Sequence, residues 1–134
     1  MKIIAGLDVG NGYVKGAGHE AKSAEKMKAD IPSGACSITT SSDIKTKPED
    51  VPGVIDDIFN QMDISFDSPL IRDMNRHLFG ERAVQSGKYV DEFDVFSALS
   101  KAKQEIGPTL TLATCAGLAL KEYYKENGKL PEDT

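Results

Sequence analysis

The sequence predicts an α/β protein, a sheet covered by helices and built as one domain over residues 1–134. Three observations favour this class. The chain begins with strand-like residues interrupted by Asn-Gly, it ends with two segments of helical periodicity, and 40% of its residues are hydrophobic and 28% charged, as in globular proteins. A length of 134 residues suits one compact unit, because most domains contain about 100–150 residues.

The first predicted element is a β-hairpin over residues 3–19. Residues 3–9 (IIAGLDV) form a nearly continuous apolar run, which favours a strand that is covered on both faces and central in its sheet. Gly10-Asn11-Gly12 separates this run from the strand-compatible residues 13–19. Asn-Gly is a strong hairpin signal because both residues tolerate a positive φ.

The middle of the chain is less regular. Residues 20–30 are rich in charge and alanine and predict a solvated excursion or a short helix, whereas residues 31–38 predict a third strand. A polar surface loop is expected at residues 39–50. Residues 51–74 mix helical spacing in their first half with short apolar runs typical of strands in their second half. Residues 77–84 predict a strand or turn that leads into a short helix.

Two helices are expected at the end of the chain. The first covers residues 93–106 and is ended by Gly107-Pro108. The second begins at Pro108 and ends at Gly128, a typical C-terminal capping residue. Its apolar residues fall at i, i+3, i+4, i+7, i+8 and i+11 and predict one stripe that docks on the sheet. The stripe consists of Leu112, Cys115, Ala116, Ala119, Leu120 and Tyr123.

Charge and cysteine content exclude several classes of function. Sixteen basic and 21 acidic residues give a net charge of −5, which argues against direct binding to nucleic acid or to an anionic membrane. Cys36 and Cys115 lie far apart, and neither they nor His19 and His77 have metal-ligand spacing. We expect two buried thiols in a cytoplasmic protein, with a disulfide between them as the alternative. No apolar run reaches the about 18 residues of a membrane-spanning helix, and we expect no signal peptide.

Residues 8–15 (DVGNGYVK) are the candidate functional segment. Asp8 ends a strand predicted to be buried, where a carboxylate needs a partner such as a hydrated divalent cation. Gly10, Asn11 and Gly12 offer turn amides to a phosphate, and Lys15 on the return strand reaches the same phosphate as a point charge. These groups predict a site for a metal-bound triphosphate. The alternative is a plain Asn-Gly hairpin, since the pattern matches neither a Walker A loop nor a dinucleotide-binding turn.

Residues 3–15 (IIAGLDVGNGYVK) resemble the first phosphate motif of the superfamily of actins, sugar kinases and heat-shock-chaperone ATPases. The Asn-Gly turn followed by an aromatic residue and Val-Lys is most similar to the plasmid-segregation actins (ParM/StbA-like). Three further pieces agree with this family in order and spacing: residues 31–33 (IPS), residues 79–83 (FGERA) and a long helix that ends with LKEYY at residues 120–124. Within FGERA, Gly80 and Glu81 are expected to form a structural turn and helix start.

The resemblance implies a ribonuclease-H-like mixed sheet that opens with a β-hairpin and is flanked by helices. Asp8 would orient Mg²⁺ through water, and Gly10, Asn11, Gly12 and Lys15 would contact the phosphates of ATP or GTP. The chain would then be the N-terminal subdomain of a prokaryotic actin-like ATPase that forms filaments and segregates plasmid DNA through a DNA-binding adaptor. The unpaired strand edges expected of such a subdomain also predict self-association by strand pairing or as a swapped oligomer.

The superfamily builds its site between two domains, and the second domain supplies another phosphate hairpin and a glycine-rich adenosine motif. Neither motif occurs in these 134 residues. We therefore expect the second half of the ATPase to lie elsewhere, and this chain alone to bind ATP weakly or not at all and not to hydrolyse it. No catalytic residue is assigned. Two alternatives stay open: a subdomain of a kinase or chaperone-type ATPase of the same superfamily, or a non-enzymatic interaction module.

Overall fold

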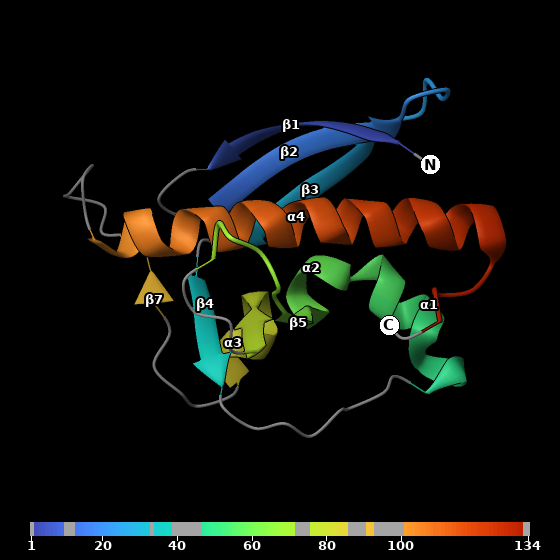
Figure 1. Cartoon of the computed structure of the whole chain (residues 1–134). Coiled ribbons are helices and arrows are strands. Elements are labelled where there is room, and N and C mark those ends of the chain that lie inside the picture. Colours follow the sequence, from blue (N-terminus) through green and yellow to red (C-terminus); the bar gives the residue numbers. More distant parts are fainter. Residues whose placement is uncertain are drawn as a thin grey trace.

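Two small antiparallel sheets and one long helix, α4 (Lys101–Asn127), dominate the fold (Figure 1). The computed structural model describes residues 2–9, 13–32, 34–38, 47–71, 76–85, 91–92 and 101–132. α4 contacts strands of both sheets. The predicted α/β class is confirmed at this level. All strand pairs among the described residues are antiparallel, so the parallel neighbour that a mixed sheet needs is not among them.

The first sheet has the order β1-β2-β3 and contains β1 (Ile3–Val9), β2 (Tyr13–Glu20) and β3 (Met27–Pro32). The predicted hairpin is confirmed, with Val9 opposite Val14 in the register of β1 and β2. The prediction that β1 is central and covered on both faces is wrong within the described residues. β1 lies at an edge of this sheet, and the side chain of Ile4 is 49% exposed.

β3 begins earlier than the sequence predicts. Residues 21–26 form the expected solvated turn, but residues 27–30 are already strand. Met27 and Ala29, two residues apart, both pack on the core, and this period of two is typical of a strand. The single strand predicted over residues 31–38 is also wrong, because β3 ends at Pro32 and β4 (Gly34–Ile38) belongs to the second sheet.

The second sheet has the order β5-β6-β4-β7 and contains β4, β5 (Asp63–Ser65), β6 (Arg76–Phe79) and β7 (Asp91–Glu92). β6 runs directly into α3 (Gly80–Gln85), as the sequence predicts for residues 77–84. Gly80 makes this turn possible with a φ of +59°, and a Cβ atom here would lie 2.6 Å from the Phe59 carbonyl oxygen. The structural role expected for Gly80 is confirmed.

Residues 48–61 form three short helical segments: the 3₁₀ helix η1 (Pro48–Asp50), α1 (Val51–Asp56) and α2 (Ile58–Gln61). The helical spacing seen in the first half of residues 51–74 is therefore confirmed. The strand character predicted for the second half is confirmed only for β5, since Leu70 and Ile71 lie in and after a turn. The loop predicted at residues 39–46 lies outside the described residues.

α4 is one continuous helix of 27 residues, and the predicted break at Gly107-Pro108 is wrong. Proline inside a helix loses one backbone hydrogen bond and costs about 3 kcal/mol. A residue with a Cβ before proline also disfavours the helical conformation, but Gly107 has none. Packing of α4 against both sheets, α1 and α2 offsets the remaining cost. The predicted C-terminal cap is confirmed: Gly128 has a φ of +68° and its N–H donates to the Tyr124 carbonyl over 2.7 Å. Residues 93–100 of the predicted first helix lie outside the described residues.

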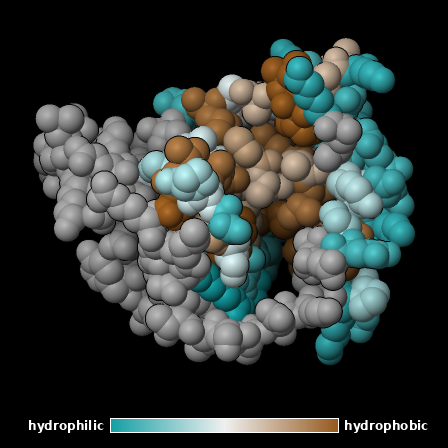
Figure 2. Space-filling model, viewed as in Figure 1, coloured by the Kyte–Doolittle hydropathy of each residue, from teal (hydrophilic) through white to brown (hydrophobic). Residues whose placement is uncertain are grey.

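The core-facing side of α4 also differs from the predicted stripe. Its buried residues from residue 107 onward are Thr109, Leu110, Ala113, Thr114, Gly117, Leu118 and Glu122. Of the predicted stripe, Ala116 and Leu120 pack at the border of the core, whereas Leu112, Ala119 and Tyr123 are only half-buried and Cys115 is exposed. Figure 2 shows hydrophobic residues across the middle of the molecular surface seen in this view, where α4 runs in Figure 1.

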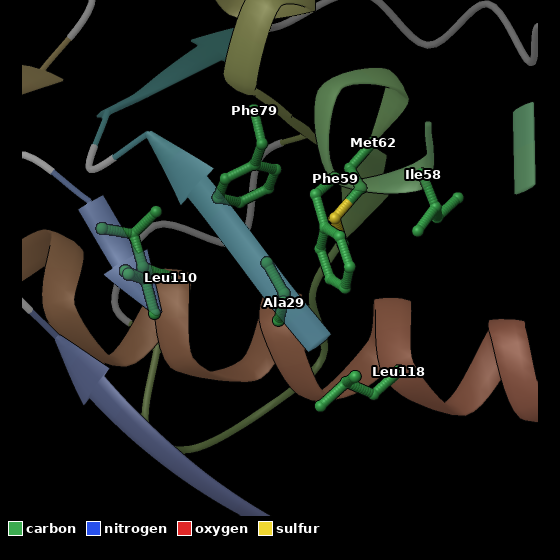
Figure 3. Close-up of a cluster of buried hydrophobic side chains, with 9 residues drawn as sticks. Ala29, Ile58, Phe59, Met62, Phe79, Leu110 and Leu118 are labelled. Carbon is green, nitrogen blue, oxygen red and sulfur yellow. The ribbon is translucent and has the colours of Figure 1, made fainter. Parts of the chain in front are cut away.

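The core lies between α4 and the elements packed on it (Figure 3). Phe59 from α2 lies so close to α4 that a Cβ atom on Gly117 would be 2.6 Å from its ring. Leu118 contributes on the side of the first sheet, where its Cδ1 atom lies 3.2 Å from the position of a Cβ on Gly18. Small residues at Gly117 and Gly18 thus allow α4 to approach both neighbours closely. The buried cluster consists of Val14, Ala29, Ile58, Phe59, Met62, Phe79, Leu110, Ala113 and Leu118.

Candidate phosphate-binding hairpin

Asp8 and Lys15 lie opposite each other near the loop end of the β1–β2 hairpin. The Ala21 N–H donates to the Lys2 carbonyl over 2.8 Å, so Lys2 and Ala21 form a hydrogen-bonded pair. Such pairs alternate along an antiparallel ladder, and Asp8 with Lys15 is another one, with Cα atoms about 5.5 Å apart. The two side chains share one face of the sheet and both are exposed.

A second carboxylate continues this row across the sheet. Lys15 is opposite Asp8 on one side and opposite Asp30 of β3 on the other. Their neighbours Val14 and Ala29 are buried in the core beside α4, so the row of Asp8, Lys15 and Asp30 lies on the opposite, uncovered face. Lys15 is therefore a cation between two carboxylates, and Asp30 is a member of this row that the sequence reasoning missed.

The position of Asp8 differs from the expectation in one respect. The sequence argument placed its carboxylate at the end of a buried strand, where an unpaired charge is costly. Asp8 is instead exposed, so burial gives no reason for it to need a cation. What remains of the predicted site is the pairing of a carboxylate and an ammonium group at the hairpin's end.

Gly10, Asn11 and Gly12 lie outside the described residues. The strand residues next to them bring a second segment of the chain to this end of the sheet. Tyr13, which follows the three turn residues, is opposite Pro32 of the Ile-Pro-Ser segment. Two segments about 20 residues apart in sequence thus meet beside the hairpin loop.

Asp8 is suited to one mode of magnesium binding only. Among the described residues, no three His, Cys, Asp or Glu side chains are grouped so that they would hold a metal ion by themselves. Mg²⁺ commonly keeps several waters and uses one or two carboxylates together with substrate phosphates. A single exposed carboxylate fits that mode and does not fit a cation site made of protein ligands alone.

A second charged cluster lies in the other sheet. Asp63 of β5 accepts hydrogen bonds from Arg76 of β6, with Nε at 2.5 Å from Oδ1 and Nη2 on Oδ2. Arg82 of α3 lies 3.7 Å from the same carboxylate and donates to the Gln61 carbonyl over 3.0 Å. This cluster joins β5, β6 and α3. Sequence reasoning missed it, because the separation of these residues along the chain carries no local signal.

Beside this cluster, His77 lies in an aromatic environment. It is buried, stacks on Phe79 with ring centroids 6.2 Å apart, and meets Phe66 edge-on at 5.5 Å. These contacts give the His77 ring a role in packing the core.

The cysteine prediction is wrong for Cys115, which is a free and exposed thiol on α4. The side chain of Cys36 lies outside the described residues, although its backbone belongs to β4. An exposed ion pair joins the end of α4 to the first sheet. Lys125 near the end of α4 pairs with Glu25 of the β2–β3 turn, and this hydrogen bond raises the pKa of Lys125 above its usual 10.5.

No protein-family model, curated protein or solved structure matches this chain. None of the helices in the described part of the chain has both the length and the apolar character needed to cross a membrane.

Proposed function

We propose that this chain is the N-terminal, phosphate-binding part of a prokaryotic actin-like ATPase with a ribonuclease-H-like sheet. The observation that carries the proposal is the pairing of Asp8 with Lys15 at the loop end of the first hairpin, next to the Gly10-Asn11-Gly12 segment. In the complete protein this half-site binds Mg²⁺ and ATP or GTP. Filament formation and plasmid segregation through a DNA-binding adaptor belong to the same proposal.

The chemistry of the pair supports a bound metal–triphosphate. Lys15 supplies a positive charge to a phosphate oxygen, and Asp8, directly opposite, accepts hydrogen bonds from the water shell of Mg²⁺. Both side chains are exposed on the uncovered face, so a ligand reaches them without a rearrangement of the core. The turn amides between them would complete the phosphate contacts.

One hairpin supplies only part of such a site. The superfamily that residues 3–15 resemble holds its nucleotide between two phosphate hairpins. We therefore expect weak binding of Mg-ATP by this chain and no hydrolysis. Robust ATP turnover by the purified 134-residue chain would contradict the half-site proposal.

Titration of the isotope-labelled chain with Mg-ATP, followed by amide NMR shifts, tests the site. We expect saturable shifts that are largest at Asp8, Lys15 and the turn between them. Asp8→Asn and Lys15→Ala should each weaken the apparent affinity about three- to tenfold, since each removes one exposed charged contact worth roughly 0.7–1.4 kcal/mol.

Matched controls lie away from the hairpin's charged row. Lys28→Ala removes the same charge as Lys15→Ala from an exposed position on β3, and Asp56→Asn removes the same charge as Asp8→Asn from an exposed position on α1. These variants should leave the affinity within about twofold of the original, because neither residue lies opposite Asp8 or Lys15. Equal losses from the site and control variants would mean that Mg-ATP responds only to the general charge of the chain. Absence of any saturable shift would favour the plain structural hairpin.

A further inference from the structure

The free edge of β1 is accessible along most of its length. Within the part of the chain that the structure describes, β1 pairs with β2 on one side and with no strand on the other. Lys2, Ile4, Ala5, Gly6 and Asp8 are all exposed, and the side chain of Ile4 is 49% exposed. An open edge of this kind presents unpaired N–H and C=O groups to any strand that meets it.

The hydrogen-bonding pattern of the hairpin shows which residues present those groups. The Lys2 carbonyl accepts a hydrogen bond from the N–H of Ala21, which directly follows β2. Even-numbered residues of β1 therefore point their backbone groups toward β2. The odd-numbered residues therefore point theirs outward. Ile3, Ala5 and Leu7 form this outward set within residues 2–8.

Charge selects one antiparallel register for two β1 strands. The outward N–H and C=O groups of two β1 strands can bond only when odd-numbered residues of one strand lie opposite odd-numbered residues of the other. In an antiparallel pair of identical strands, this requires a twofold axis that passes through a residue. An axis at Ala5 places Lys2 opposite Asp8 in two symmetric pairs. It also places Ile4 opposite Gly6, where no atom lies within 4 Å of a potential Cβ. An axis at Gly6 places Asp8 opposite Ile4, and an axis at Leu7 leaves Lys2 unpaired.

We propose that two copies of this 134-residue chain associate by antiparallel pairing of their β1 strands about a twofold axis at Ala5, on the edge where a ribonuclease-H-like mixed sheet would place a parallel neighbour of β1. The three strands of each copy then form one continuous sheet with both α4 helices on the same face. About six main-chain hydrogen bonds and two Lys2–Asp8 pairs hold the strands together. The contact is closed and self-complementary, and its short length places it among weak, concentration-dependent interfaces.

Sedimentation equilibrium of the chain without nucleotide tests this pairing. We expect the weight-average mass to rise with concentration toward twice that of one chain. Lys2→Asp puts two like-charge pairs in the interface and should raise the dimer dissociation constant about tenfold. Adding Asp8→Lys to that variant restores opposite charges and should restore the dimer. A chain that stays monomeric at all accessible concentrations overturns the proposal.

Two further variants separate this interface from other modes of association. Lys28→Asp makes the same charge change on the exposed face of β3 and should leave the dissociation constant unchanged. Ala5→Pro removes an outward N–H that β2 does not use, so it should abolish the dimer while far-UV circular dichroism stays the same. Equal effects of Lys2→Asp and Lys28→Asp would overturn the proposed register, as would failure of the double variant to recover. The assay contains no nucleotide, so its failure leaves the ATP proposal standing.

Discussion

The side chain of Asp63 joins its own strand β5 to β6 and α3. Its carboxylate holds Arg76 and lies 3.7 Å from Arg82, and the side chains of Asp63 and Arg76 are only 15% and 13% exposed. Replacing Asp63 by Ala leaves the guanidinium of Arg76 partly buried without this carboxylate. Removing one partner of a fully buried pair costs about 3–5 kcal/mol, and partial exposure reduces the expected loss here to about 2–3 kcal/mol. Urea unfolding at neutral pH measures this difference.

The exposed pair between Lys125 and Glu25 is the control for Asp63. Both of these side chains are largely in solvent, where ion pairs contribute little to stability. Glu25→Gln should therefore leave the urea midpoint nearly unchanged. Lys125 is charged at neutral pH, and the hydrogen bond to Glu25 raises its pKa above the usual 10.5. Any contribution of this pair is therefore fully present below pH 10.5 and is lost as the pH rises through the raised pKa. Equal destabilisation by both variants would contradict the difference in burial.

At the scale of elements, the most informative feature is the proline inside α4. Pro108→Ala restores the missing N–H and removes the clash with the preceding turn. We expect the free energy of unfolding to increase by about 2 kcal/mol. Removing the interior proline recovers ~3 kcal/mol, and the greater freedom of the unfolded chain takes back up to ~1 kcal/mol. Thermal or urea unfolding gives the value. If a helix instead began at Pro108, as the sequence predicts, the substitution would bring no such gain.

Pro52 supplies the matched control for this substitution. It lies in the first turn of α1, where its lack of an N–H leaves no helical bond unmade. Pro52→Ala should be neutral or slightly destabilising. A similar gain at both positions would show a general effect of losing proline and not the interior position of Pro108.

Local signals account for the elements that the sequence predicted correctly. Asn-Gly identifies the hairpin, and the sequence around Gly80 and Gly128 identifies a helix start and a helix end. The elements that were predicted wrongly depend on tertiary contacts. Residues 106–120 carry no charge, so polarity does not show which face of α4 is buried. The structure buries the face with Gly117 and Ala113, because small residues there allow close approach to Phe59.

The candidate site likewise combines one feature that the local sequence predicted with others that depend on tertiary contacts. A motif predicted that Asp8 and Lys15 would be neighbours, and the hairpin register places them opposite each other. The exposure of Asp8 and its shared row with Asp30 depend on β1 being an edge strand in the described sheet. An apolar run such as residues 3–9 indicates a strand, but which faces are covered depends on the elements around it.

At the scale of the whole molecule, α4 connects two sheets that share no described strand pair. It contacts β1, β2 and β3 of the first sheet and β4 and β7 of the second. Leu110, Ala113 and Leu118 of α4 belong to one buried cluster that also includes residues of β2, β3, α2 and β6. Because both sheets are covered by the same helix and core, we expect them to unfold together.

Leu118→Ala tests this coupling. Leu118 is fully buried next to Gly18 of β2, and truncation of a buried leucine costs about 2–5 kcal/mol. We expect the free energy of opening, measured by native-state hydrogen exchange, to fall by the same amount in β2 and in β6, although Leu118 faces the first sheet. Leu70→Ala, at a position that is 67% exposed, should change protection in neither strand by more than about 0.5 kcal/mol. If Leu118→Ala lowered protection only in β1–β3, the two sheets would open as separate units and α4 would not couple them.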